Sequence, residues 1–157
     1  MISKTKKSAG LLVFRRKGPL LEVFLAHMGG PFWERKDEGA WSIPKGEFDE
    51  ETPLNAAIRE FSEETGLVPE GKFIELTPVK QPSGKTILAF ALEWDCDAAV
   101  IKSNTFSLEW PKGSGTMCEF PEIDRAAWFP LDQARRKIVK GQIPIIDELQ
   151  KLMASEH

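Results

Sequence analysis

The sequence predicts an α+β fold in which a mixed β-sheet is packed between helices, and two observations support this class. Apolar segments of strand length alternate with segments of helical periodicity, in the order strands, helix, strands, helices. The chain has 157 residues, of which 41% are hydrophobic and 29% are charged, an ordinary balance for a globular protein. Because a chain of this length can bury a substantial core, we expect a single domain over residues 1–157.

The first two elements are predicted to form a β-hairpin. The apolar segments 9–14 and 20–26 flank the turn-like sequence Arg-Arg-Lys-Gly-Pro. Residues 27–40 are rich in glycine and charge and are expected to form a loop. Residues 41–43 follow as a short strand that ends at Pro44.

The clearest helix is predicted over residues 53–65. Thr52 suits the N-cap, Pro53 the first helical position and Gly66 the C-terminal cap. Four apolar residues follow the spacing of one buried stripe, namely Leu54, Ala57, Ile58 and Phe61. Further strands are then expected at 72–79, 86–94 and 126–129, and further helices at 131–139 and 144–153. Residues 95–116 are polar and are expected to be irregular.

Charge and composition exclude several classes of function. The formal net charge of -3 argues against nucleic-acid binding through a broad basic face, but leaves room for a small phosphorylated ligand. No apolar run approaches the roughly 20 residues of a membrane span. The basic start, Met1–Lys7, is followed by too short an apolar stretch for a signal peptide. We therefore expect a cytoplasmic protein with no membrane partner, as a monomer or a homodimer.

Three glutamates near the end of the predicted helix are the most informative feature. Glu60, Glu63 and Glu64 lie on one side of the helix, because positions three and four apart are neighbours. Like charges four apart destabilise a helix by about 0.2–0.5 kcal/mol, and anions in its last turn by about 0.3–1 kcal/mol. A solvated acidic face is the alternative, but a bound divalent cation reverses both effects. Carboxylates are the ligands that Mg²⁺ prefers.

The stretch from Gly46 to Leu67 resembles the Nudix box, the signature of the MutT-like Nudix hydrolases. In that pattern a glycine is followed after five residues by a glutamate, and after seven more by Arg-Glu-apolar-any-Glu-Glu-any-Gly-apolar. Residues 51–67 match it, but only four residues separate Gly46 from Glu51, so Glu50 and Glu51 both compete for the role of the first glutamate. The approach segment 41–46 is similar to that of members acting on dinucleoside polyphosphates or nucleoside triphosphates. The resemblance implies the family's α/β/α sandwich.

The resemblance also implies roles in metal binding. Glu60 and Glu64 would be direct ligands of Mg²⁺, for which Mn²⁺ could substitute, and Glu63 would coordinate the metal or hold a water. Gly46 would let the backbone approach the metal, with its carbonyl as a further ligand. Arg59 would orient the carboxylates through charge-assisted hydrogen bonds. The alternative for Arg59 is an ordinary surface ion pair.

Substrate contacts and the general base are expected outside the helix. Lys45 would neutralise a phosphate, unless it is simply a solvated lysine. Glu119 and Glu122 are the candidate bases on a later loop, and the spacing from the following strand favours Glu122. Phe32 and Trp33 could sandwich a nucleobase, although aromatic residues more often belong to a core.

These expectations describe a Mg²⁺-dependent hydrolase that cleaves a diphosphate linkage in a nucleoside diphosphate derivative. A dinucleoside polyphosphate or a nucleoside triphosphate is the first expectation for the substrate, and ADP-ribose or a nucleotide sugar is the second. A non-catalytic module that binds nucleotide is an alternative of another class. The presence of Glu60, Glu63 and Glu64 together argues against this non-catalytic alternative, because a protein that only binds nucleotide does not need this acidic cluster.

Overall fold

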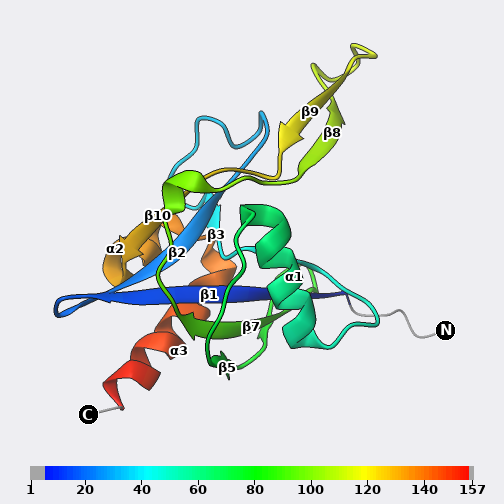
Figure 1. The fold of residues 1–157 in the computed structure, drawn as a ribbon. Helices are drawn as coiled ribbons and strands as arrows, with labels where there is room; N and C mark the ends of the chain where they lie inside the picture. The colour runs from blue at the N-terminus through cyan, green and yellow to red at the C-terminus, as the bar shows by residue number, and fades with distance from the viewer. Residues whose placement is uncertain (1–5, 156–157) are drawn as a thin grey trace.

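The computed structural model describes residues 6–155 and shows a mixed β-sheet between helices (Figure 1). The strands are β1 (Lys7–Lys17), β2 (Leu20–Met28), β3 (Trp41–Ser42), β4 (Lys45–Glu47), β5 (Phe73–Glu75), β6 (Val79–Lys80), β7 (Thr86–Glu93), β8 (Thr105–Glu109), β9 (Met117–Pro121) and β10 (Ile123–Pro130). The helices are α1 (Pro53–Thr65), α2 (Leu131–Lys137) and α3 (Ile143–Ala154), with short 3₁₀ turns η1 (Ala98–Val100) and η2 (Lys140–Gln142).

The main sheet has the strand order β10-β2-β1-β7-β5, with β3 paired to β2, β4 to β1 and β6 to β7. The β1–β7 pair is parallel and the other pairs are antiparallel. One face of the sheet packs against α1 through a cluster that includes Leu11, Phe24 and Phe61. The opposite face packs against α2 and α3 in a second cluster, and this confirms the predicted α/β/α sandwich.

The place where β1 and β2 separate positions the site. The two strands pair from Phe14 to Lys17, and beyond that point β4 pairs with β1 while β3 pairs with β2. The segment 41–47 therefore fills the gap between the diverging strands. The Leu11 N–H donates to the Pro44 carbonyl at 3.2 Å, and this bond holds the crossing between β3 and β4 in place. The segment also brings Gly46 next to α1.

Helix α1 has the predicted bounds and caps. The Thr52 hydroxyl accepts from the Asn55 N–H, Pro53 opens the helix, and Gly66 ends it in the left-handed conformation at φ 76°. Only glycine adopts that conformation without strain, which explains the stop at this position.

Two predicted segments differ from the structure. The strand expected over 72–79 is broken into β5 and β6, because Pro78 has no N–H to donate and the Thr77 N–H donates instead to Glu148. Residues 95–116 are less irregular than expected, because β8 pairs with β9 in a two-stranded ribbon that projects from the body (Figure 1). The alternation of half-buried and exposed residues along both strands is the period-2 pattern of a sheet with one covered face.

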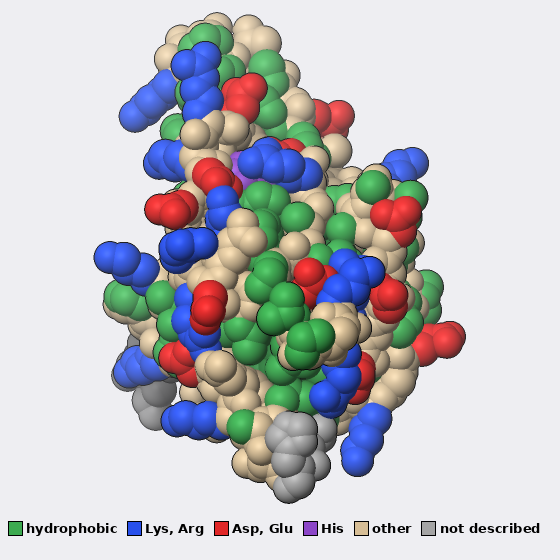
Figure 2. Space-filling model, turned by 90° about the vertical axis from the view of Figure 1, so that its left-hand side faces the viewer, with side chains coloured by type: hydrophobic (Ala, Val, Ile, Leu, Met, Phe, Trp, Pro, Cys, Tyr) green, Lys and Arg blue, Asp and Glu red, His purple; other side chains and the backbone are tan. Residues whose placement is uncertain are grey.

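The surface and the ends of the chain bear on the predicted partners. On the face shown in Figure 2, Lys and Arg side chains are interspersed with Asp and Glu around a group of hydrophobic side chains. Within residues 6–155, no helix is long and apolar enough to cross a membrane. Most of the basic start considered above, Met1–Lys7, lies outside the described residues.

Candidate active site

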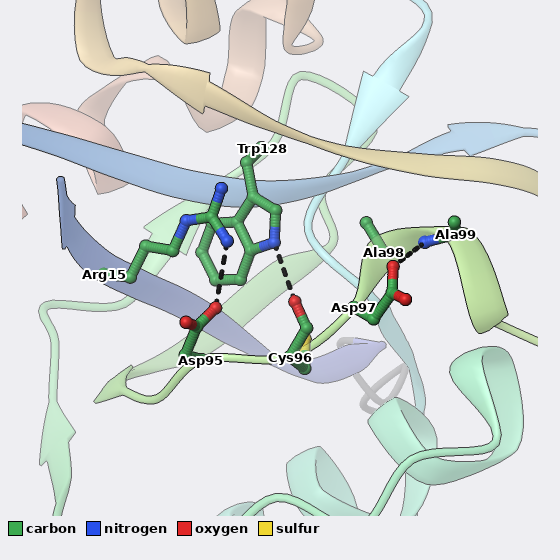
Figure 3. Close-up of a pocket in the computed structure, with 7 residues that line it drawn as sticks. All are labelled: Arg15, Asp95, Cys96, Asp97, Ala98, Ala99 and Trp128. Atoms are coloured by element: carbon green, nitrogen blue, oxygen red, sulfur yellow. Dashed lines mark hydrogen bonds and ion pairs between the residues drawn. The ribbon is translucent and has the colours of Figure 1, made fainter.

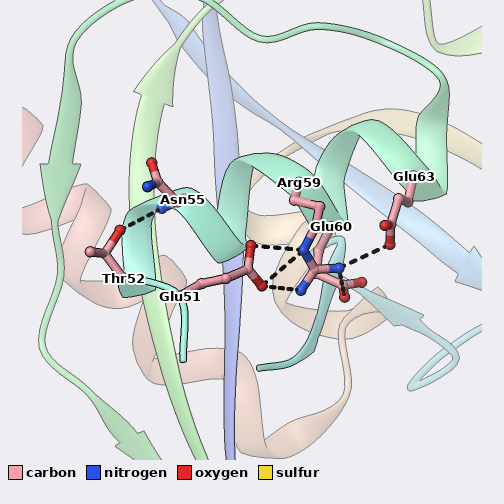
Figure 4. A network of polar contacts seen from close by, with 6 residues as sticks. All are labelled: Glu51, Thr52, Asn55, Arg59, Glu60 and Glu63. Atoms are coloured by element: carbon pink, nitrogen blue, oxygen red, sulfur yellow. Dashed lines mark hydrogen bonds and ion pairs between the residues drawn. The ribbon is translucent and has the colours of Figure 1, made fainter. Parts of the chain in front are cut away.

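Arg59 holds three carboxylates together on the outer side of α1 (Figure 4). Its Nε donates to both oxygens of Glu51 at 2.9 Å, and its Nη2 donates to Glu51 Oε1 at 2.6 Å. Its Nη1 donates to Glu60 at 2.8 Å and to Glu63 at 3.1 Å. Every guanidinium nitrogen is engaged, so Arg59 joins all three carboxylates at once. Glu51, rather than the exposed Glu50, takes the place of the first glutamate despite the shorter loop.

Glu64 lies apart from this network and faces the diverging strands. Its Oε2 accepts from the Lys45 N–H at 3.1 Å, which joins the end of α1 to the start of β4. The neighbouring Gly46 touches Glu60, and a Cβ at this position would overlap the Glu60 carboxylate. Only glycine therefore lets the β4 backbone come this close to the acids.

Burial and neighbouring negative charges disfavour the ionised forms of Glu60 and Glu64. Burial, together with the nearby Glu60 charge, raises the pKa of Glu64 to about 8. Burial also raises the pKa of Glu60, against the opposing effect of Arg59. The hydrogen bonds that Arg59 donates to Glu51 are the largest cause that raises the pKa of Arg59, so the guanidinium stays charged. Lys45 is half-buried rather than solvated, and its burial lowers its pKa.

The residues fit a divalent cation in their chemistry. Within the described part of the chain, no three His, Cys, Asp or Glu side chains form a ready metal-binding group, and Arg59 binds Glu60 and Glu63. The donors available are carboxylate and carbonyl oxygens, which Mg²⁺ prefers. The glycine at position 46 leaves a cradle beside Glu60, and the Glu64 carboxyl is partly buried, which raises its pKa despite the nearby Lys45.

The two later glutamates lie in different surroundings. Glu122 follows β9 directly, is exposed, and is close enough to Glu64 for its charge to raise the Glu64 pKa. Glu119 lies within β9 opposite Ser107, on the exposed face of the ribbon. The charge of Glu122 thus acts on an acid of α1, whereas Glu119 belongs to the ribbon.

The two aromatic residues of the loop before β3 are not equivalent. Trp33 packs against the core cluster on the side of α2 and α3, and the Lys36 ammonium lies 5.2 Å from its ring centre. Phe32 is 61% exposed and meets the Trp110 ring edge-to-face at 5.5 Å. The exposed pair is thus Phe32 with Trp110, whereas the position of Trp33 matches the core alternative.

A shallow cavity of about 560 Å³ lies elsewhere, between β10 and η1 (Figure 3). The Arg15 guanidinium stacks 4.2 Å from the centre of the Trp128 ring and donates to Asp95 and Glu22 at 2.9 Å. The Trp128 Nε1–H donates to the Cys96 carbonyl at 3.0 Å. The polar groups of its walls are thus paired with one another, and the cavity shares no residue with the acids of α1.

The α/β/α sandwich, with carboxylates gathered at one end of α1, is the arrangement that the resemblance to the Nudix hydrolases implies. The comparison of sequences gives the family: the NUDIX domain model matches residues 4–149, and the chain belongs to this family. Members of the family generally use divalent metal cations. Membership of this family supports the assignment of the protein as a pyrophosphohydrolase. No curated protein sequence matches the chain.

Solved structures with the same fold include proteins of several activities. The Nudix domain of Shewanella oneidensis NrtR, complexed with ADP ribose, superposes with a TM-score of 0.69 at 17% identity, over 97% of this chain and 90% of that one. A C. elegans Ap4A hydrolase in a binary complex superposes with a TM-score of 0.65 at 18% identity, over 94% and 98%. The E. coli ORF135 protein superposes with a TM-score of 0.60 at 18% identity, over 96% of this chain and 92% of that one. At these identities the likeness shows the fold alone.

Some features of the site could not be read from the Nudix box. Asn104 links the segment of Glu122 to the end of α1, because its N–H donates to the Glu63 carbonyl at 3.1 Å and its carbonyl accepts from the Glu122 N–H at 2.8 Å. Trp110 meets Phe32 because the ribbon contacts the loop before β3, where Phe106 also lies against Gly30. The alternation of β8 and β9 was the available signal for the ribbon, but no local signal marks these two contacts.

Proposed function

We propose that this protein is a Mg²⁺-dependent hydrolase of a diphosphate linkage in a nucleoside diphosphate derivative, with a dinucleoside polyphosphate or a nucleoside triphosphate as the first candidate substrate. The observation that carries the proposal is the approach of the Gly46 backbone to Glu60, with Glu64 partly buried beside it. Stability alone does not account for two neighbouring acids with raised pKa values at this helix end. Mn²⁺ is expected to substitute for Mg²⁺.

Glu60 and Glu64 would hold the metal, with the Gly46 carbonyl as a further ligand and Glu63 as a ligand or a water-binding group. A bound divalent cation lowers the pKa of water and neutralises charge on the diphosphate. Arg59 keeps Glu60 and Glu63 aligned through its hydrogen bonds. Glu51 fixes the guanidinium in turn by binding its other edge.

Glu122 would act as the general base. In this role its carboxylate takes a proton from the water as the water oxygen bonds to phosphorus, and the phosphorus–oxygen bond to the leaving phosphate breaks with its electron pair on the leaving oxygen. Lys45 would offset the negative charge that gathers on the phosphate oxygens. Phe32 would stack on the nucleobase, with Trp110 supporting its ring.

ADP-ribose is the second candidate substrate, and the complex of the Shewanella oneidensis NrtR domain with ADP ribose favours it. The full-length protein of that name also has a structure with a 27mer DNA, so a regulatory role without catalysis is the alternative from another class. The present chain covers 62% of that longer chain, and it retains the complete acidic group. The acidic group favours catalysis.

A screen of nucleoside diphosphate compounds tests the proposal. Dinucleoside polyphosphates, nucleoside triphosphates, nucleotide sugars and ADP-ribose are incubated with millimolar Mg²⁺, and both phosphorus-containing products are identified by ³¹P NMR. We expect release of a nucleoside monophosphate or diphosphate that stops when a chelator is added. Tight nucleotide binding without turnover across the whole set would support the regulatory alternative instead.

A further inference from the structure

The imidazole of His27, at the end of β2, is fully buried and has an oxygen at each ring nitrogen. Nδ1 lies 2.8 Å from an Asp124 carboxylate oxygen, and Nε2 lies 2.6 Å from the Lys36 carbonyl oxygen. A carbonyl only accepts, so Nε2 carries a hydrogen, and the contact to Asp124 then requires a second proton held between the two side chains. The ring also meets Trp41 edge-on at 5.1 Å. His27 thus ties β10 and the loop before β3 to the end of β2.

Asp124 occupies an irregular position in β10. Ile123 lies opposite Met28 and Arg125 lies opposite His27, so one additional residue, Asp124, is accommodated between them. Such a bulge bends a strand and changes where the neighbouring side chains point, and bulges are common beside active sites. The hydrogen bond with His27 holds this bulge, and the Arg125 guanidinium lies 3.6 Å from the same carboxylate.

The bulge begins two residues after Glu122, and the backbone on both sides of Glu122 is fixed. The Gly29 N–H donates to the Glu122 carbonyl at 2.9 Å, and the Glu122 N–H donates to the Asn104 carbonyl at 2.8 Å. A side chain at Gly29 would overlap the Pro121 carbonyl, so the segment lies directly against the end of β2. The Glu122 backbone therefore lies between the end of β2 and the bulge, and its place depends on where the bulge is held.

We propose that His27 and Asp124 are positioning residues, which hold the bulge of β10 and thereby fix the backbone that carries Glu122. Neither side chain touches the acids of α1, so neither takes part in the reaction. The effect on rate rests on the function of Glu122 proposed above, whereas the effect on the position of the backbone does not. If the pair had a purely structural role, replacing either residue would lower stability, but its effect on kcat would not depend on whether Glu122 is present.

A double-mutant cycle separates these roles. Asp124→Ala should lower kcat at least tenfold in the wild-type background, and should lower it by less than twofold when Glu122→Gln is already present. Asp124→Asn keeps an acceptor for the His27 Nδ1–H, so its kcat should fall by less than that of Asp124→Ala. Glu148 on α3 provides the matched control. Glu148→Ala removes two hydrogen bonds that Thr77 donates and should leave kcat unchanged.

Hydrogen exchange tests the placement without any substrate. The amides of Gly29 and Glu122 should exchange at least tenfold faster in Asp124→Ala, while the amides of α3 keep their wild-type rates. Should Asp124→Ala not fold, Asp124→Asn is measured in its place, with a smaller acceleration expected at the same two amides. Equal losses of kcat in both backgrounds, or unchanged exchange at Gly29 and Glu122 in a folded variant, would overturn the proposal. A wild-type protein that hydrolyses nothing would count against the proposed function alone.

Discussion

Replacing Glu64 by glutamine should abolish activity and at the same time stabilise the metal-free protein. Burial raises the pKa of this carboxyl from 4.5 to about 8, so the folded protein holds a proton here at pH values where the unfolded chain has lost it. The folded state thus binds more protons, and stability falls as pH rises from about 4.5 to about 8. Glutamine keeps an oxygen for the Lys45 N–H but has no proton to lose, so the variant escapes this loss.

The expected size follows from the two pKa values. At pH 7 the unfolding free energy of the wild-type protein should be lowered by at most about 3.5 kcal/mol, because pH 7 lies 2.5 units above 4.5 and each unit corresponds to about 1.4 kcal/mol. Below about pH 4.5 the wild-type protein and Glu64→Gln should have equal stability, and above about pH 8 the difference should stop growing.

Chemical denaturation at pH 4.5, 6, 7 and 8.5 in the presence of a chelator measures this difference. Glu50→Gln, a change of the same chemistry at an exposed position, is the matched control and should show a difference below about 0.5 kcal/mol at every pH. A Glu64→Gln variant that is less stable than wild type at pH 7, or whose advantage does not grow with pH, would refute the reasoning about burial.

The remaining predictions concern the other groups of the site. Glu122→Gln should lower kcat by about 10²–10⁴-fold with little change in KM, whereas Glu119→Gln should stay within threefold, and the opposite order would move the base to β9. Arg59→Ala should weaken Mn²⁺ binding at least tenfold in a titration, because Glu60 and Glu63 lose their alignment; unchanged affinity would contradict this role. Gly46→Ala should abolish turnover because its Cβ overlaps Glu60, and a normal rate would show that β4 can move away. Phe32→Ala should raise KM several-fold for nucleotides with little change in kcat, and an unchanged KM would exclude stacking.

The local features of the site were predictable where short-range rules determine them. The bounds of α1 follow from Thr52, Pro53 and Gly66, whose capping preferences act over a few residues. The grouping of Glu60, Glu63 and Glu64 on one side follows from helix geometry, although their division between Arg59 and the Lys45 N–H does not.

The features that depend on distant contacts were not predictable in this way. The competition between Glu50 and Glu51 could be resolved only by the position of Arg59, eight residues further along the chain. The bulge at Asp124 exists because β10 must fit β2 and receive the His27 hydrogen bond, and no local pattern marks it. The exposure of Phe32 and the core packing of Trp33 likewise depend on the ribbon and on the opposite layer.

The most direct measurement is the anomalous difference density of a crystal soaked in Mn²⁺. The account predicts a peak within coordination distance of carboxylate oxygens of both Glu60 and Glu64, close to the Gly46 carbonyl, with Arg59 still bound to Glu51. A well-diffracting crystal in which these carboxylates keep their present hydrogen bonds, and in which no peak lies between them, would contradict the claim that this end of α1 binds the catalytic metal.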